Sequence, residues 1–208
     1  MPPTPTETAK TDIDSTTTER PDGRRVRGER NKDAVVEALL SLYEAGDVEP
    51  SMARVAELAG VSERSVFRYF DDKDDLISSA LSRQLERVGH LYEGLSVEGS
   101  FDQRLGAILD HRLRLFDAVA GVMRASEFLE HRSPIIRSAI DRRRSILRAQ
   151  AVDQFRPELN RLDDQQTASR AIDVALSLET IAYLARHYKR SQLRDTLAFM
   201  VRSALKLR

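Results

Sequence analysis

Residues 64–69 bring together side chains that can bind a nucleic acid. The segment carries two arginines, a serine and two aromatic rings: Arg64, Ser65, Phe67, Arg68 and Tyr69. On a helix, Arg64 and Arg68 share one face because they are four positions apart. Guanidinium groups can donate paired hydrogen bonds to guanine, a hydroxyl can bind a phosphate or a base, and aromatic rings can contact thymine methyl groups. The segment therefore indicates a surface that reads the major groove of duplex DNA.

Two short helices with a tight turn between them are expected to hold this surface out. Ser51 and Ser62 are placed to cap the two helices, and Gly60 falls where a left-handed backbone is needed. Small and apolar residues at helical spacing predict the seam between the helices: Val55, Ala56, Val61, Val66 and Phe70. This layout is typical of a helix-turn-helix. The alternative is a helical hairpin that never touches DNA.

The stretch from Val35 to Leu76 resembles the N-terminal domain of the TetR family of bacterial regulators. The matching motifs are Val55-Ala56, then Ala59-Gly60-Val61-Ser62, then Phe67-Arg68-Tyr69-Phe70, and finally Lys73-Asp74-Asp75-Leu76, with Gly46 at the family's spacing before them. These motifs are specific in combination. The length of the chain and its all-helical remainder agree with the same family less specifically.

The resemblance implies roles for individual residues. Phosphate contacts would come from Ser51, from position 67 and from Lys73, and base contacts from Arg64, Ser65 and Arg68. Two positions depart from the family pattern. Phe67 replaces the usual tyrosine and so lacks a hydroxyl for phosphate, and Arg64 stands where a small residue is common. We therefore expect an operator that differs from those of typical members. Tyr69 completes the expected recognition face.

The N-terminal segment divides into two parts. Residues 1–22 are rich in threonine and proline and are expected to be disordered, because they cannot bury enough apolar surface. In residues 20–32, which overlap the end of this segment, basic residues outnumber Asp22 and Glu29: Arg20, Arg24, Arg25, Arg27, Arg30 and Lys32. The resemblance places Arg25 and Arg27 just before the first helix, near the DNA backbone or minor groove. The alternative is an ordinary solvated linker.

From Arg30 onward apolar residues recur at helical spacing, with no alternating strand pattern. The expected fold is all-α with about nine helices, including one over 73–92, one over 171–185 and a break at 156–162. We expect a disordered tail (1–24), a three-helix DNA-binding domain (25–72), and a helical domain for ligand binding and dimerisation (73–208).

The last two expected helices suggest a dimer. Residues 171–185 are apolar on two sides, so one side can face the core and the other a second chain. The resemblance also implies a four-helix interface between two subunits. The predicted interface residues are Leu178, Ile181, Ala182, Leu197, Met200 and Val201. The alternative is a monomeric bundle with a thick core.

The resemblance further implies a small-molecule pocket among the helices of the C-terminal domain. Its predicted lining is His111, Phe116, Met123, Phe128 and Tyr183. Core packing is the alternative for each of them. Five arginines near Asp141 are interpreted as a solvated face, with an acidic ligand as the alternative: Arg137, Arg142, Arg143, Arg144 and Arg148.

Composition and missing motifs exclude several classes of protein. The 208 residues include 33 basic and 33 acidic ones, which excludes a uniformly basic nucleic-acid binder. No apolar run reaches the length of a membrane span, and no secretory signal is evident, so a cytoplasmic protein is expected. Without cysteine, a glycine-rich phosphate loop or a nucleophile elbow, no catalytic residue and no cofactor is predicted. Glu127 and His131 lack a third ligand, so no metal site is predicted either.

The sequence therefore predicts a DNA-binding transcriptional regulator. Its most specific form is a homodimeric repressor that a small-molecule effector releases from a palindromic operator. The first alternative is a regulator or architectural protein with no effector. The second is a helical interaction protein whose head has lost DNA binding.

Overall fold

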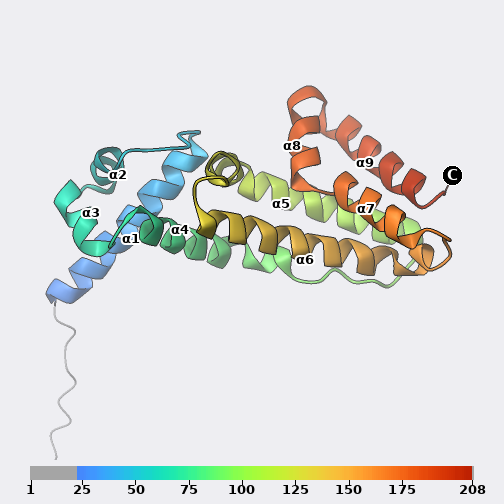
Figure 1. The fold of residues 1–208 in the computed structure, drawn as a ribbon, viewed down its shortest axis with the longest axis horizontal. Coiled ribbons are helices and arrows are strands. Elements are labelled where there is room, and N and C mark those ends of the chain that lie inside the picture. The colour runs from blue at the N-terminus through green and yellow to red at the C-terminus, as the bar shows by residue number, and fades with distance from the viewer. Residues whose placement is uncertain (1–22, 208) are drawn as a thin grey trace, which may run out of the picture.

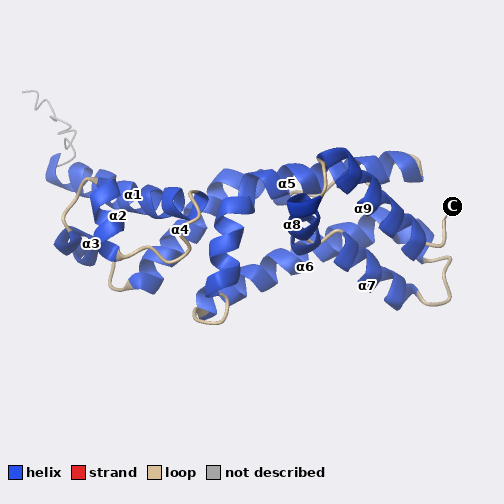
Figure 2. Ribbon diagram, turned by 90° about the horizontal axis from the view of Figure 1, so that it is seen from above, coloured by secondary structure: helices blue, strands red, loops and turns tan. Residues whose placement is uncertain are grey.

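Residues 23–207 are described by the computed structural model, and within this range the chain forms α-helices and one 3₁₀ helix, with no strand (Figures 1 and 2). In chain order the elements are α1 (Gly23–Glu44), α2 (Met52–Ala59), α3 (Glu63–Tyr69), α4 (Lys73–Val88), the 3₁₀ helix η1 (Gly89–Tyr92), α5 (Phe101–Leu129), α6 (Pro134–Leu159), α7 (Gln165–Ala175), α8 (Leu178–His187) and α9 (Arg190–Ala204). The expected all-α fold is confirmed for these residues.

The molecule is elongated, with α2 and α3 at one end and the C-terminus at the other (Figure 1). The long helices α5 and α6 run antiparallel along the body. The connection from α4 to α5 runs beside α6, so that α5 starts at the far end of the body and returns toward α1 (Figure 1). Helices α7, α8 and α9 pack on the other side of this pair.

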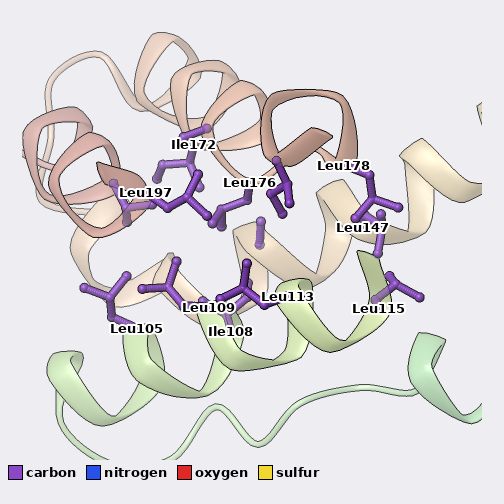
Figure 3. Packing of buried hydrophobic residues seen from close by; sticks show 14 of the residues in the cluster. Leu105, Ile108, Leu109, Leu113, Leu115, Leu147, Ile172, Leu176, Leu178 and Leu197 are labelled. Atoms are coloured by element: carbon purple, nitrogen blue, oxygen red, sulfur yellow. The ribbon is translucent and has the colours of Figure 1, made fainter. Parts of the chain in front are cut away.

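Two clusters of buried side chains hold the fold together. The first joins α1–α4 to the near ends of α5 and α6 and includes Val35, Leu39, Val55, Val66, Phe70, Leu76, Ile77, Val122, Ala125, Leu129, Ile136 and Ile140. The second lies among α5–α9, where Leu105, Ile108, Leu109, Leu113 and Leu115 face Leu147, Ile172, Leu176, Leu178 and Leu197 (Figure 3). The core of the N-terminal helices is therefore completed by side chains from the body.

The N-terminal basic stretch differs from the expectation. Helix α1 begins at Gly23, so Arg25 and Arg27 lie on the first turns of a helix and not before it. The predicted disorder of residues 1–22 falls outside the described residues. The predicted boundary between 72 and 73 stays a prediction, although Leu76 and Ile77 beyond it pack into the first cluster.

Three expected helix bounds are corrected. The helix expected over 73–92 ends as an α-helix at Val88, and its last turn is the 3₁₀ helix η1. The helix expected over 171–185 is two helices, because Ser177 caps α8 by accepting a hydrogen bond from the Thr180 N–H at 3.1 Å. Helix α6 continues to Leu159 instead of ending near position 156.

Helix α6 bends near its end. Pro157 lies inside it, and Phe155, two residues earlier, has non-helical backbone angles of φ −115° and ψ 16°. A proline has no N–H to donate and its ring crowds the carbonyl four residues before it, so a kink is the expected response. Pro134 starts the same helix, where its missing N–H leaves no hydrogen bond unmade.

Candidate nucleic-acid interface

The turn between α2 and α3 has the geometry that its residues predict. Gly60 adopts a left-handed conformation with φ 68°, which a residue with a Cβ rarely adopts. The N–H of Val61 then donates to the carbonyl of Ala56 at 3.0 Å, and the Gly60 N–H to that of Glu57 at 3.1 Å. These bonds satisfy carbonyls at the end of α2 and fix the direction in which α3 departs.

Serine side chains start both helices. The Ser51 Oγ accepts a hydrogen bond from the Arg54 N–H at 3.2 Å, and the Ser62 Oγ accepts one from the Ser65 N–H at the same distance. The two serine oxygens at 62 and 65 are also 2.9 Å apart, so one hydroxyl donates to the other. The predicted caps are confirmed, and Ser62 and Ser65 together hold the start of α3.

Helix α3 is divided into a buried and an exposed side. Val66 and Phe70 are buried against Val55 and Ala56 of α2, as the sequence predicts. This packing turns Arg64, Phe67 and Arg68 to the exterior, and 57% of the Phe67 surface is exposed. An exposed aromatic ring on the same side of a helix as two exposed arginines is typical of a binding surface.

Tyr69 has a more specific position than the sequence indicated. Its hydroxyl accepts hydrogen bonds from Asn31 Nδ2 on α1 at 3.3 Å and from the Arg68 guanidinium at 3.0 Å. These bonds, the one from Asn31 first, lower the pKa of Tyr69 despite some desolvation. The Arg68 guanidinium also lies over the Tyr69 ring, 5.0 Å from its centroid. Tyr69 therefore ties α3 to α1 and orients Arg68.

Asn31 is a site residue that sequence reasoning missed. It lies on α1 ahead of the apolar positions that reveal this helix, and nothing in the local pattern pairs it with a residue 38 positions later. Lys32 beside it lies over the Phe70 ring at 4.9 Å. Both contacts brace the recognition helix from α1.

The remaining predicted DNA contacts lie outside α3, on α1 and α4. Lys73 is half-buried at the first position of α4, where Asp72 caps the helix by accepting from the Asp75 N–H at 2.8 Å. Arg25 and Arg27 are exposed on α1, and Arg25 pairs with Glu29 at 3.3 Å. These residues stay predictions as DNA contacts.

Residues 35–80 match the family model described as bacterial regulatory proteins, tetR family. This chain carries the N-terminal domain of the TetR family. The match includes the end of α1, the helix-turn-helix and the start of α4. The geometry of α2 and α3 and the family match agree on a DNA-binding transcriptional regulator.

Solved structures of similar fold cover most of the chain. A tetR-family transcriptional regulator from Streptomyces coelicolor superposes with a TM-score of 0.65 at 19% identity, covering 85% of this chain and 80% of the other. A transcriptional regulator from Rhodococcus sp. Rha1 gives 0.65 at 18% identity, with 86% and 96% covered. One from Pseudomonas aeruginosa PAO1, described as putative, gives 0.62 at 19%, with 89% and 93% covered. At these identities the likeness shows the fold. The search of curated proteins gave no match.

Two of the contacts that fasten the TetR-family domain to the body are made by α1. Arg83 of α4 donates to Asp33 at 2.7 Å and to Glu37 at 3.2 Å, both on α1. On the other side, the end of α1 lies directly against α5, where a Cβ added to Gly121 would lie 2.7 Å from the Cα of Glu44. A movement of α4 or α5 would therefore shift α1 as well.

The predicted pocket residues are not gathered around one cavity. His111 and Met123 are buried in the body, and Phe116 packs partly against the same core. Phe128 and Tyr183 are exposed, Tyr183 by 62%. The ligand pocket stays a prediction. Within the part of the chain that is described, no three His, Cys, Asp or Glu residues are grouped as metal ligands.

The predicted dimer residues lie mostly inside the chain's own core. Leu178, Ile181, Leu197 and Val201 have no exposed surface, and Ala182 and Met200 are partly covered by the same cluster. The apolar side of α8 and α9 that the sequence assigned to a partner is the side that fills the body. The exposed large residues of this part of the chain are instead Val174 of α7, Tyr183 of α8, Phe199 of α9, and Tyr188 directly after α8.

Two further observations concern the whole described chain. In residues 23–207 no helix combines the length and the apolar character needed to cross a membrane. The arginines of α6, interpreted as a solvated face, are partly paired: Arg143 and Arg144 both bind Glu179, and Arg148 binds Asp173 at 2.6 Å. The interpretation is corrected for Arg143, whose side chain is 12% exposed, while the Arg148 side chain is 59% exposed and agrees with a solvated face.

Proposed function

We propose that the protein is a homodimeric repressor that binds a palindromic operator and leaves it when a small molecule binds the body. The observation that carries the DNA-binding part is the outward face of α3. Arg64, Phe67 and Arg68 are exposed there while caps, a glycine turn and Tyr69 hold the helix in place. A recognition helix of this kind reads base edges from the major groove.

The dimer is supported by the outer surface of α7–α9. Tyr183 of α8 and Phe199 of α9 are 62% and 70% exposed, and Val174 of α7 and Tyr188, which directly follows α8, are exposed as well. Large apolar side chains in water on neighbouring helices are typical of an association surface. A two-fold dimer would place its recognition helices about 34–36 Å apart and so read a palindrome.

Ligand control rests on linkage. A small molecule releases DNA only when it binds the DNA-incompetent conformation better than the competent one. The contacts of α1 with α4 and with α5 give a physical route from the body to the TetR-family domain. DNA in a bacterium lies in the cytoplasm, which is where we propose that the protein works.

One observation favours the alternative of a DNA-binding regulator with no effector. The cavity between α6, α7 and α8, lined by Leu147, Ala151 and Leu176 among others, has room for about one water molecule. A body with so little space at this place can serve as a rigid dimerisation unit. The two functions differ in whether any metabolite changes the affinity for DNA.

Selection from random duplexes tests the proposal. We expect the purified protein to enrich an inverted repeat at near-physiological salt, and sedimentation to give a dimer on the selected site. Release from that duplex by a small molecule would support the repressor with an effector. An operator that no metabolite affects would support the alternative. Failure to enrich any sequence would refute DNA reading and leave a helical interaction protein.

A further inference from the structure

Among the described residues 23–207, Arg112 is a buried cation that has no carboxylate partner. Its exposed fraction is 0%, and its guanidinium donates to Gln150 Oε1 at 2.8 Å, to the Leu147 carbonyl at 2.8 Å and to His111 Nδ1 at 2.9 Å. All of these acceptors are neutral. Its Nε has no hydrogen-bond partner, and within the described residues no acid forms an ion pair with it.

A second buried arginine on the same helix has the carboxylate partner that Arg112 lacks. Arg104 is also buried, but it binds the Glu158 carboxylate at 2.6 Å. Burial lowers the pKa of Arg112 to about 10, so the group is still charged at neutral pH. The acid whose charge acts most on it is Asp173, which is already bound by Arg148 at 2.6 Å. An unpaired buried charge is strongly unfavourable, and an anion that reached Arg112 would relieve it.

We propose that Arg112 is the recognition residue for the effector of this regulator, and that the effector is an apolar molecule with a single carboxylate. This inference rests on the proposed function, because it names the chemical class of the small molecule that releases the operator.

The environment of Arg112 favours this class of anion. A guanidinium binds a planar carboxylate through paired hydrogen bonds, and one carboxylate balances its single charge. A phosphate monoester carries close to two charges at neutral pH and would leave a buried excess. Apart from polar partners such as His111 and Gln150, the side chains of the body core are aliphatic or aromatic, including Leu113, Leu147, Ala151 and Phe155. The rest of the effector must therefore be apolar.

The partners of Arg112 hold the connection between α4 and α5. Because an arginine only donates, His111 must accept at Nδ1 and donate from Nε2, and Nε2 lies 2.5 Å from the Leu91 carbonyl. Arg112 likewise fixes the oxygen of Gln150, so that its amide donates to the carbonyls of Tyr92 and Glu93 at 2.9 and 3.0 Å. Arg112 thus orients both donors.

Two more side chains continue the same series of contacts. Gln154 Nε2 donates to the Ser96 carbonyl at 2.8 Å, and Arg104 donates to the Gly99 carbonyl at 3.4 Å. Backbone carbonyls along the connection are therefore held in turn by buried donors from α5 and α6. Since this connection continues directly from α4, its position and that of α4 are linked (Figure 1).

A carboxylate at Arg112 would compete with this arrangement. It would take guanidinium N–H groups from His111 and Gln150, which would lose the bonds that orient them toward Leu91, Tyr92 and Glu93. The end of α4 would be released, and α4 is fastened to α1 through Arg83. The closed body around Leu147 is then the ligand-free conformation, and opening it is the change that the effector favours.

The direct test is calorimetric titration of the full-length protein with benzoate, hexanoate and decanoate, each against its matched primary alcohol, and with inorganic phosphate. We expect at least one acid to bind at least ten times more tightly than its alcohol, and phosphate not to compete with it. The same acid should release the selected duplex in an anisotropy assay. If no acid binds more tightly than its alcohol, the proposal is wrong.

Variants assign the binding to the guanidinium. Arg112→Met should weaken binding of the acid at least tenfold and leave binding of the alcohol unchanged. Arg114→Met, on the exposed side of the same helix, is the matched control and should bind the acid as the wild type does. An Arg112→Met protein that folds and keeps the wild-type affinity for the acid would overturn the assignment.

A second variant remains informative if Arg112→Met does not fold. Gln150→Glu places a carboxylate next to the guanidinium, because the Gln150 Oε1 is 2.8 Å from it. We expect this variant to lose binding of the acid and, without any acid, to bind the duplex as weakly as the acid-saturated wild type. Gln154→Glu is its control, since Gln154 holds the same connection and makes no bond to Arg112. Equal loss in both variants would overturn the proposal.

The outcomes separate this inference from the proposed function. Calorimetry needs no DNA, so acid binding can succeed even if no operator is selected, and then only the proposed function fails. If an operator is selected and no acid binds, only this inference fails.

Discussion

The Cα of Glu44, at the end of α1, lies against Gly121 in the middle of α5. A Cβ at position 121 would lie 2.7 Å from that Cα and 3.3 Å from the Glu44 Cγ. Glycine in a helix interior is less favourable than alanine by about 1 kcal/mol. Its presence at position 121 is explained by the close contact between the backbones of α1 and α5. The contact sets how closely the TetR-family domain approaches the body.

Gly121→Ala should destabilise the protein for this reason. We expect the free energy of unfolding to fall by about 1–3 kcal/mol, because the opposing atom is backbone and cannot swing away. Denaturant unfolding followed by circular dichroism measures the change. Gly106→Ala is the control on the same helix: its Cβ would meet only the tip of Arg194 at 3.6 Å, so helix propensity should make it neutral or stabilising. Two equally stable variants would contradict the close-contact argument.

Arg68→Ala should weaken binding to the selected operator by about 1–3 kcal/mol and relax the preference at one base position. Arg68 is exposed on α3 and oriented by the Tyr69 ring and hydroxyl, so it is preorganised for one base. Repeating the selection with the variant measures both effects. An unchanged motif with unchanged affinity would remove Arg68 from the reading face.

Lys73→Ala should have a different signature. A lysine at the start of α4 would contact phosphate, so its loss should weaken all duplexes alike and lower the salt dependence by about one phosphate. Affinity measured against salt concentration, on the operator and on a scrambled duplex, tests this. Loss confined to the operator would instead indicate a base contact.

Acid should destabilise the body through His111. Desolvation first, and then the charge of Arg112, lower the pKa of His111 below its ordinary value of 6.5, although the Leu91 carbonyl opposes this. The unfolded chain therefore takes up a proton at a higher pH than the folded one, and stability is lost as the pH falls through about 6.5. The slope is at most about 1.4 kcal/mol per pH unit.

His111→Gln isolates this contribution, because its amide can accept from Arg112 and donate to Leu91 without titrating. The difference in unfolding free energy between wild type and variant should grow in the variant's favour as the pH is lowered from 7.5 to 5.5. The other histidines are present in both proteins and cancel. A difference that does not change with pH would show that His111 is not held neutral.

Glu158→Ala should be costly, because it leaves Arg104 buried without its partner. The two side chains are 5% and 10% exposed, and removing one member of such a pair costs about 3–5 kcal/mol. The exposed pair of Arg190 and Asp117 is the control, and Asp117→Ala should cost no more than about 1 kcal/mol. Thermal unfolding of both variants makes the comparison, and similar losses would refute the role of burial.

Local chemistry made much of the DNA-binding end predictable. Gly60, Ser51 and Ser62 act on atoms within a few residues, so their roles can be read from spacing alone. The same holds for Pro134 and for the buried positions of Val66 and Phe70. These interactions depend on helical geometry, which repeats along any chain.

Long-range pairing could not be predicted in the same way. An apolar stripe such as that of Leu178 and Ile181 shows that a face is buried, but not whether its own chain or a partner covers it. Arg112 gave no signal in the sequence, since an arginine on an amphipathic helix is ordinarily exposed. The contact of Asn31 with Tyr69 likewise depends on how α1 crosses α3.

The side chains Val122, Ala125, Leu129, Ile136 and Ile140 complete the cluster that Val35, Val55 and Phe70 begin. The reading head of this regulator is consequently not a portable module. Expressed alone, it would lose the side chains of α5 and α6 that complete its hydrophobic core. Joined to the body of another regulator, it would pack against side chains of a different shape. Exchanging specificities between relatives therefore requires transplanting surface residues of α3, with the scaffold beneath them left whole.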